Sequence, residues 1–497
     1  MTYREADLLY QKGVSSLKNR NRIAEIISHE LAHQWFGNLV TMNWWNDLWL
    51  NEGFATYMSY TGQQLVDPES RPQDRFVLEN NQYAFELDST EASHPVRPED
   101  EDVVNPVDIG LMFDPISYQK GAALIRMLTY LIGEDTFVRG VSNYLAANAY
   151  DNAMQDDLWE KLTEAAHEDG SLPPEITVKR IMDTWTTQKG YPVVTVSQGG
   201  ATDTTVTLAQ DRFLMGKPDS SRTYGWWVPV SLVRVGGDFT DFTNIAFIAP
   251  NERNVSVSVS PGESPLIVNV LEANYYRVNY DDAHWIALAD AVKADADSVH
   301  KINRAQLIDD ALNLAKAGYL DYGTALGMTE YLDGENEFVP WSSAKTAFSY
   351  INLMLLGYKD VKSLVEGFLF SKVVHVYNAL GTESDRDDSY FDVLLRELSV
   401  GYVCGFGYTP CVQVAAAQFG LWMAAEDPDS AAANPIDESL RAIFYCTAVK
   451  IGASKVSYIM VLSSHFSPVP YFSPFYEIFF INKRGRRSKT NGMRLLC

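Results

Sequence analysis

The chain has 497 residues and a formal net charge of −24, with 46% hydrophobic and 21% charged residues. A single hydrophobic core does not grow to this length, so we expect about three domains of ordinary soluble composition. Because a phosphate backbone is bound by a basic face, the acidic balance predicts no nucleic-acid partner. The four cysteines are too few for a disulfide scaffold and lack the spacing of a zinc ribbon.

No targeting or membrane-spanning segment is predicted. The N-terminus lacks the apolar region of a signal peptide, and the chain has no run of about 18 apolar residues. The segment 459–481 is apolar and aromatic, but its three prolines and its glutamate argue against a spanning helix. The basic run 483–489 that follows is interpreted as a solvated tail.

The first part of the chain, to about residue 185, favours helices. Ile23, Ile27 and Leu31 recur every four positions, which predicts a helix whose apolar face packs into a core. Gly37 should end that segment. Further helices are predicted over residues 50–60, 118–131 and 156–166, with a loop over the acidic, proline-rich stretch 91–106.

Near Tyr191 the spacing of apolar residues changes from the helical pattern to short, partly alternating segments. Four short segments are rich in β-branched residues and separated by Gly and Asp turns, and they predict a small β-sandwich. These segments are 191–196, 204–208, 226–232 and 255–260. After Tyr276 the helical period returns and continues to about Val449, where stacked helix pairs are expected.

The pattern His29-Glu30-Leu31-Ala32-His33 lies inside the first predicted helix. Residues four apart share one helix face, so both imidazoles can reach the same metal ion. A catalytic zinc needs a third protein ligand and one open position for water, and Glu52 in the next predicted helix supplies the third. Glu30 can then act as the base that takes a proton from the water. A short pattern of this kind also occurs by chance, so each histidine alone would be an ordinary core or surface residue.

The segment 29–41, followed by 44–56, resembles the zinc-binding region of the aminopeptidase N family, and its residues most resemble the insect midgut branch. The resemblance implies that His29, His33 and Glu52 bind one Zn²⁺ per chain and that Glu30 is the catalytic base. The segment 113–122 is similar to the family segment whose tyrosine stabilises the transition state, which assigns that role to Tyr118. Without the resemblance, Tyr118 would be interpreted as a tyrosine that packs at the start of a helix.

Weaker matches extend the resemblance along the chain. Residues 190–193 resemble the start of the family's β-sandwich, and residues 275–280 resemble the start of its helical domain. The Gly and Pro residues between Cys404 and Cys411 would allow a local bridge, with two free thiols as the alternative. The spacing of these cysteines resembles a family disulfide, which favours the bridge.

The resemblance implies a multidomain α+β fold. We predict a mostly helical, thermolysin-like zinc catalytic domain over 1–190, a small β-sandwich over 191–274, a helical-repeat C-terminal domain over 275–450, and a divergent tail over 451–497. Both the catalytic and the C-terminal domains are expected to be partial. The family's N-terminal β-domain and its amine-gripping Gly-Ala-Met-Glu-Asn segment have no counterpart here, so part of the apolar face of the zinc helix should be exposed.

The implied activity is zinc-dependent hydrolysis of neutral, alanine-like N-terminal residues from peptides that have a free N-terminus. An inactive truncated fragment is one alternative to this activity. The resemblance also implies a cell-surface or extracellular location. A second alternative is a non-catalytic surface protein that docks a bacterial toxin, as midgut members of the family do. Another is an endopeptidase, because the thermolysin group shares the five-residue pattern.

Overall fold

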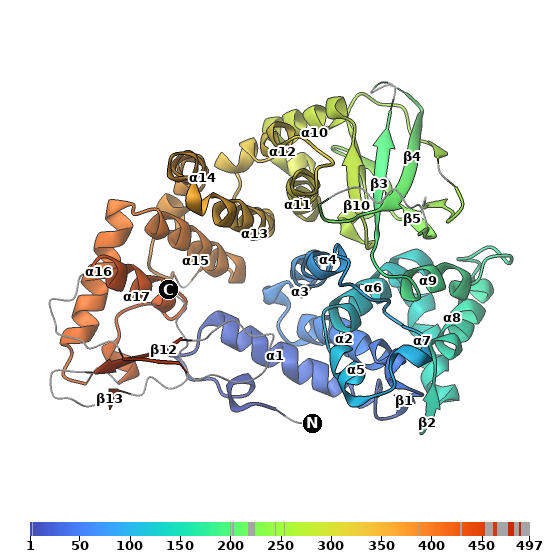
Figure 1. Cartoon of the computed structure of the whole chain (residues 1–497), viewed down its shortest axis with the longest axis horizontal. Helices are drawn as coiled ribbons and strands as arrows, with labels where there is room; N and C mark the ends of the chain where they lie inside the picture. The colour runs from blue at the N-terminus through green and yellow to red at the C-terminus, as the bar shows by residue number, and fades with distance from the viewer. Residues whose placement is uncertain are drawn as a thin grey trace. The chain divides into compact units, whose positions relative to one another are not determined.

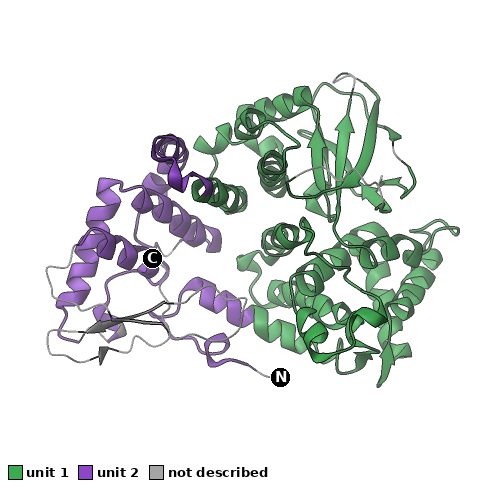
Figure 2. Ribbon diagram, in the orientation of Figure 1, with its two compact units in different colours: residues 1, 25–353 green, residues 2–24, 354–497 purple. Residues whose placement is uncertain are grey.

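The structure is a computed structural model that describes residues 1, 3–198, 200, 203–216, 224–243, 245–252, 254–385, 387–427, 430–452, 461–464, 476–481 and 487–488. The chain divides into two compact units (Figure 2). The first comprises residues 1 and 25–353, and the second comprises residues 2–24 and 354–497. The fold is α+β with several domains, as predicted; the domain boundaries proposed from the sequence stay predictions.

Helices build the part of the first unit that contains the candidate site (Figure 1). The longer ones are α1 (Leu17–Ala32, which begins in the second unit), α2 (Trp49–Val66), α6 (Gly121–Ile132), α7 (Glu134–Ala147), α8 (Gln155–Asp169) and α9 (Val178–Thr186). Shorter elements are α3 (Pro72–Phe76), η4 (Val77–Gln82), α4 (Tyr83–Asp88), α5 (Pro106–Leu111) and η6 (Ile116–Lys120), and the strands β1 (Val40–Met42) and β2 (Asp151–Ala153) pair in parallel. The helices predicted over 50–60, 118–131 and 156–166 are confirmed as α2, η6 with α6, and α8.

For the apolar face of α1, the packing into a core that the spacing predicted was wrong, and the partial exposure predicted from the resemblance is confirmed. Ile23 and Ile27 are only partly buried, Leu31 is 45% exposed, and Ala32 is the one residue of α1 that is buried. By contrast, α6 is apolar around most of its circumference and buries nearly every residue. A four-residue apolar spacing shows which face a helix would bury, but not whether a neighbouring element covers that face.

A four-stranded sheet in the order β10-β3-β4-β8 follows the helices (Figure 1). Its strands are β3 (Pro192–Ser197), β4 (Thr205–Arg212), β8 (Val255–Ser258) and β10 (Arg277–Tyr280). Two further pairs accompany it: β5 (Val228–Val230) with β7 (Ala246–Ile248), and β6 (Leu232–Arg234) with β9 (Leu266–Val268). Strands were therefore correctly predicted in all four segments, while β7, β9 and β10 were not predicted.

Strand β10 corrects the expectation that the chain is helical from Tyr276 onward. It runs parallel to β3, with Val278 opposite Val194. Arg277 on this strand is buried and pairs with Asp309 and Asp310 of α11 at 2.7 and 2.9 Å. Pairing with a distant strand decides whether four residues form a strand, and the local spacing of apolar residues does not reveal that pairing.

Helices then continue to residue 450. They are α10 (Asp282–Ala294), α11 (Lys301–Ala317), α12 (Tyr322–Gly327), α13 (Phe338–Met354), α14 (Lys359–Leu380), α15 (Tyr390–Gly405), α16 (Thr409–Ala424) and α17 (Arg441–Lys450). Among the described residues, no helix combines the length and the apolar character needed to cross a membrane. In the tail, the described residues form β11 (Val461–Ser464), β12 (Tyr476–Ile481) and β13 (Arg487–Ser488); the rest of the predicted basic run lies outside the described residues.

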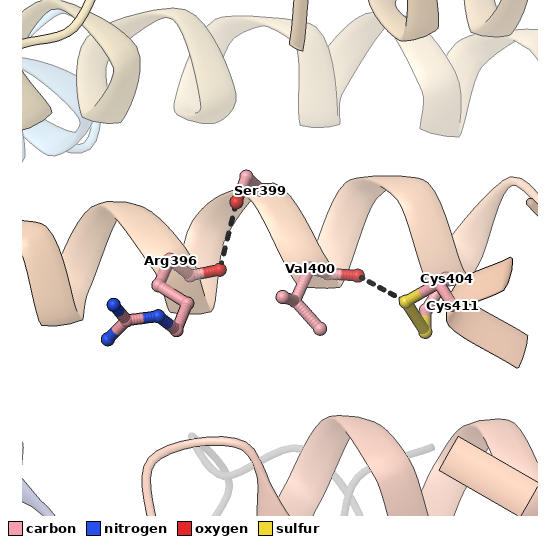
Figure 3. The surroundings of a disulfide bond; sticks show 5 residues. All are labelled: Arg396, Ser399, Val400, Cys404 and Cys411. Atoms are coloured by element: carbon pink, nitrogen blue, oxygen red, sulfur yellow. Dashed lines mark hydrogen bonds between the residues drawn. A yellow bond between two sulfur atoms is a disulfide. The ribbon is translucent and has the colours of Figure 1, made fainter. Parts of the chain in front are cut away.

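A disulfide joins Cys404 at the end of α15 to Cys411 at the start of α16 in the second unit (Figure 3). This confirms the pairing that the family resemblance implied. Cys411 is fully buried, and its sulfur lies 3.8 Å from the carbonyl oxygen of Val400, one helical turn before Cys404. The bridge therefore fixes the turn between two consecutive helices and closes a short loop.

Candidate metal centre

His29 lies in the last turn of α1, and His33 is the residue directly after the helix ends, with its N–H still bonded to the carbonyl oxygen of His29 at 3.2 Å. Their Nε2 atoms lie 3.1 Å apart, and the ring planes are inclined by 85°. The four-residue spacing therefore places both imidazoles on one helix face, as expected. The Nδ1 atom of His33 lies 3.0 Å from the carbonyl oxygen of Phe36, so an N–H at Nδ1 leaves the Nε2 lone pair available to a metal ion.

Glu52 in the first turn of α2 completes a group of three. Its Oε2 atom lies 3.2 Å from Nε2 of His29 and 3.2 Å from Nε2 of His33. An apolar contact accompanies this approach: Phe36, four residues after the end of α1, stacks on Phe54 of α2 with 4.4 Å between ring centroids. Both phenylalanines are buried. The contact between Phe36 and Phe54 thus joins the segment after α1 to the first turns of α2, close to the three donor atoms.

The three donor atoms fit a zinc ion. Ligands at about 2.0–2.1 Å in a tetrahedral arrangement are about 3.3 Å from one another. The observed separations of 3.1 and 3.2 Å are close to that edge length. Two imidazoles and one carboxylate also form the donor set of catalytic zinc sites, which keep their fourth position open for water. Other His, Cys, Asp and Glu side chains in the described part of the chain form no comparable group.

The electrostatics of the group favour a bound cation. Burial by itself would raise the pKa of Glu52, but the hydrogen bonds from His29 and His33 lower it to about 2. Burial likewise disfavours the charged form of His33, yet the contacts with Glu52 and Phe36 raise its pKa. The carboxylate is therefore ionised at neutral pH and offers a negative charge to the two imidazoles or to a metal ion.

Glu30 and Tyr118 lie at the same site. The rings of Tyr118 and His29 are nearly parallel, inclined by 6°, with centroids 6.2 Å apart. Burial and the negative charges of Glu52 and Glu30 raise the pKa of the Tyr118 hydroxyl. The charge of Glu30 also contributes to the raised pKa of His33. The structure therefore brings together all five residues that the sequence singled out: His29, Glu30, His33, Glu52 and Tyr118.

Tyr118 comes from η6, a π-helical segment that runs directly into α6. A close backbone approach brings η6 to α2. A Cβ atom on Gly53 would lie 3.1 Å from the backbone of Gly121 and 3.3 Å from the carbonyl oxygen of Ser117. Gly53 follows Glu52, and Gly121 follows η6, so the close contact between these glycines limits the distance between Glu52 and Tyr118. The sequence analysis did not identify this pair.

The residues that hold η6 also escaped the sequence analysis. Asp114 accepts hydrogen bonds from the N–H groups of Ile116 and Ser117 at the start of η6. His94 contacts the same carboxylate. The dipeptide Asp114-Pro115 was the available signal, because an aspartate followed by proline is typical of a helix start. No local signal connects His94 to it.

Comparisons with known proteins agree with this geometry. Residues 1–185 match the peptidase family M1 domain, and residues 265–463 match the ERAP1-like C-terminal domain. Aminopeptidase N of Homo sapiens is 36% identical over 465 residues, which are 92% of this chain and 46% of that protein. Aminopeptidase Ey of Gallus gallus is 34% identical over 471 residues, 92% of this chain and 46% of that protein.

Aminopeptidase A of Gloydius brevicauda is 36% identical over 428 residues, which are 85% of this chain and 43% of that protein. The chain thus spans less than half the length of each of these relatives. All three relatives are named as aminopeptidases. The region that matches the family M1 domain includes the candidate metal centre.

Proposed function

Since the chain belongs to peptidase family M1, we propose that it is a zinc-dependent aminopeptidase that hydrolyses the N-terminal bond of peptides. The observation that carries this proposal is the convergence of His29, His33 and Glu52, whose donor atoms lie 3.1–3.2 Å from one another. We assign these three residues to one Zn²⁺ per chain. When bound, zinc supplies a Lewis acid that polarises the scissile carbonyl and lowers the pKa of water.

The remaining roles belong to side chains of the site. Glu30 accepts the proton of the attacking water and returns one to the leaving amine, because it lies next to a metal ligand on the same helix. Tyr118 donates a hydrogen bond to the oxyanion that develops on the substrate carbonyl. The proximity of Tyr118 to His29 and to the charges of Glu52 and Glu30 supports that assignment.

The substrate in this proposal is a peptide with a free α-amine and a neutral, alanine-like first residue. The family resemblance supports the preference for a neutral first residue of the substrate, and the names of the relatives support the exopeptidase activity. We place the protein at the cell surface or outside the cell. The disulfide between Cys404 and Cys411 supports this location, since such bridges persist in oxidising compartments.

Hydrolysis of alanyl-p-nitroanilide by the purified chain, with zinc content measured on the same sample, tests the proposal. We expect about one zinc per chain and release of p-nitroaniline that is inhibited by a chelator. Glutamyl and lysyl p-nitroanilides test the neutral preference. Acetyl-alanyl-p-nitroanilide, whose amine is blocked, tests whether cleavage requires a free N-terminus.

The matched control is Glu30→Gln, which keeps the size of the side chain but removes the base. It should bind zinc as the unmodified chain does and lose about 100- to 10,000-fold in kcat. Equal activity in both proteins would show that Glu30 is not the base. Zinc binding with no cleavage of any alanyl substrate would contradict the proposed activity, and cleavage of the acetylated substrate would indicate an endopeptidase.

A further inference from the structure

The segment that carries Tyr118 is fixed at its start by one carboxylate. Asp114 Oδ1 accepts hydrogen bonds from the backbone N–H of Ile116 at 2.9 Å and of Ser117 at 3.2 Å. The carbonyl oxygen of Asp114 also accepts the N–H of Tyr118 at 3.2 Å. Because the first N–H groups of a helix have no partner inside the helix, an aspartate here decides where the helix starts and how it is oriented.

The second oxygen of that carboxylate contacts a histidine from the preceding loop. Nε2 of His94 lies 3.0 Å from Asp114 Oδ2, and its Nδ1 lies 2.7 Å from the carbonyl oxygen of Pro95. A carboxylate and a carbonyl are both acceptors. A neutral imidazole has one N–H and can serve only one of them, whereas an imidazolium has two and can serve both. The two contacts together therefore require the doubly protonated ring.

Ser93, the residue before His94, contacts Asp88, whose carboxylate holds the other end of η6. Lys120, the last residue of η6, lies 2.8 Å from Asp88 Oδ2 and donates to the carbonyl oxygen of Gly190 at 2.9 Å. The side chains of Lys120 and Asp88 are both fully buried. Ser93 donates to the other oxygen of Asp88. The dipeptide Ser93-His94 thus contacts the carboxylates that fix both ends of η6.

We propose that His94, as an imidazolium bonded to Asp114, is a positioning residue that fixes η6 and thereby directs the Tyr118 hydroxyl toward the substrate carbonyl. The inference rests on the proposed function for the role of Tyr118. His94 acts through Asp114 and η6 and does not contact the metal ligands. Removing its two N–H donors should let the start of η6 shift, and the hydroxyl with it.

The charges around His94 determine how this contact depends on pH. Asp114 faces it directly, and Lys120 lies on η6 with its own partner Asp88. Burial and the positive charge of Lys120 act to lower the pKa of His94. The hydrogen bonds to Asp114 and Pro95 and the negative charge of Asp114 outweigh these effects, so the pKa of His94 is raised. The imidazolium is therefore retained above the pH at which an exposed histidine loses its proton, and the contact weakens as the pH rises further.

A double-mutant cycle on alanyl-p-nitroanilide hydrolysis tests the inference. His94→Gln should lower kcat about 10- to 100-fold, since a displacement of about 1 Å at a catalytic group can cost that much, with KM and zinc content unchanged. In a Tyr118→Phe background the same substitution should have almost no further effect, because the hydroxyl that it displaces is already absent. Equal loss in both backgrounds would overturn the inference.

The matched control is His167→Gln on α8. His167 is also partly buried and also contacts a backbone carbonyl, that of Ile176 at 2.9 Å. It should leave kcat unchanged. If His94→Gln fails to fold, Asp114→Asn replaces it in the cycle, because the amide keeps an acceptor for the N–H groups of η6 but loses the charge that favours the imidazolium.

A second measurement does not depend on activity. In protein labelled with ¹⁵N-histidine, the resonances of His94 should show two protonated ring nitrogens at neutral pH. They should titrate above about 6.5, the pKa of an exposed histidine. Asp114→Asn should lower that pKa. A single protonated nitrogen at neutral pH would overturn the inference even in an active enzyme, whereas a confirmed imidazolium in a chain without activity would contradict the proposed function instead.

Discussion

The two sides of the candidate site are built differently. On the metal side, His29 in the last turn of α1 and His33 just after it lie four residues apart, and Glu52 lies in the first turn of α2. On the other side, the position of Tyr118 depends on the contact of His94 with Asp114, on the hydrogen bonds that Asp114 accepts from the start of η6, and on the buried ion pair of Lys120 with Asp88. The first side is determined almost entirely by spacing along one stretch of chain, and the second by contacts between distant residues.

This difference predicts different responses to mutation. The histidine pair should be disturbed mainly by changes to its own side chains, because the helix period fixes the spacing of His29 and His33. The position of Tyr118, by contrast, can be disturbed from several places that never touch the substrate. Catalysis should therefore be more sensitive than metal binding to substitutions outside the site.

The largest effect should come from the metal side. Glu52→Gln keeps the shape of the side chain but removes the charge that attracts the cation. Since a change beyond the ligands already costs about 10- to 100-fold in metal affinity, loss of a ligand should cost at least about 100-fold and abolish activity. Zinc content after dialysis and peptidase activity measure both effects. Glu69→Gln, at an exposed position of the same unit, is the control and should change neither.

Tyr118→Phe should separate the two sides of the site. We expect kcat to fall by about two to three orders of magnitude, because one hydrogen-bond donor to the oxyanion is removed. Zinc content and the midpoint of thermal unfolding should stay the same. A loss of zinc in this variant would show that the two sides are coupled and would break the comparison.

Gly53→Ala tests the contact that joins the two sides. The added Cβ would lie 3.1 Å from the backbone of Gly121, so α2 and the junction of η6 with α6 must shift by a few tenths of an ångström. Overpacking of this kind should cost about 1–3 kcal/mol in stability and lower kcat more than zinc affinity. Gly110→Ala is the control, because a Cβ there meets no atom within 4 Å. If both variants behave alike, the close approach does not position Tyr118.

The smallest effect concerns pH. The pKa of His94 is raised in the folded chain, chiefly by Asp114 acting against burial. A raised histidine pKa contributes stability that is complete below the pKa of the unfolded chain, about 6.5, and that is lost as the pH rises through the folded value. The difference in unfolding temperature between the unmodified chain and His94→Gln should therefore be largest in mild acid and shrink toward alkaline pH. A difference that grows with pH would contradict the assigned charge.

Both the successes and the errors of the sequence analysis have physical reasons. The helices α2, α6 and α8 were correctly located because their apolar spacing persists over several turns. The strand β10 and the helix α7 were missed. Four residues are too few for a period to be detected, and β10 forms because its backbone pairs with β3 while Arg277 reaches two aspartates on α11. The face of α1 shows the opposite case: its apolar spacing alone predicted a buried face, whereas the resemblance correctly predicted partial exposure.

The sequence by itself determined which residues could bind a metal or take part in catalysis, and which family the chain resembles. Spacing on a helix places His29 and His33 together, and the need for a third ligand indicated Glu52. The resemblance supplied the role of Tyr118 and favoured the pairing of Cys404 with Cys411. Only the tertiary structure decided how these residues are held. The Gly53–Gly121 approach, the contact of His94 with Asp114 and the buried pair of Lys120 with Asp88 join residues far apart in the chain. A local pattern cannot encode such contacts, because they exist only after the helices have packed.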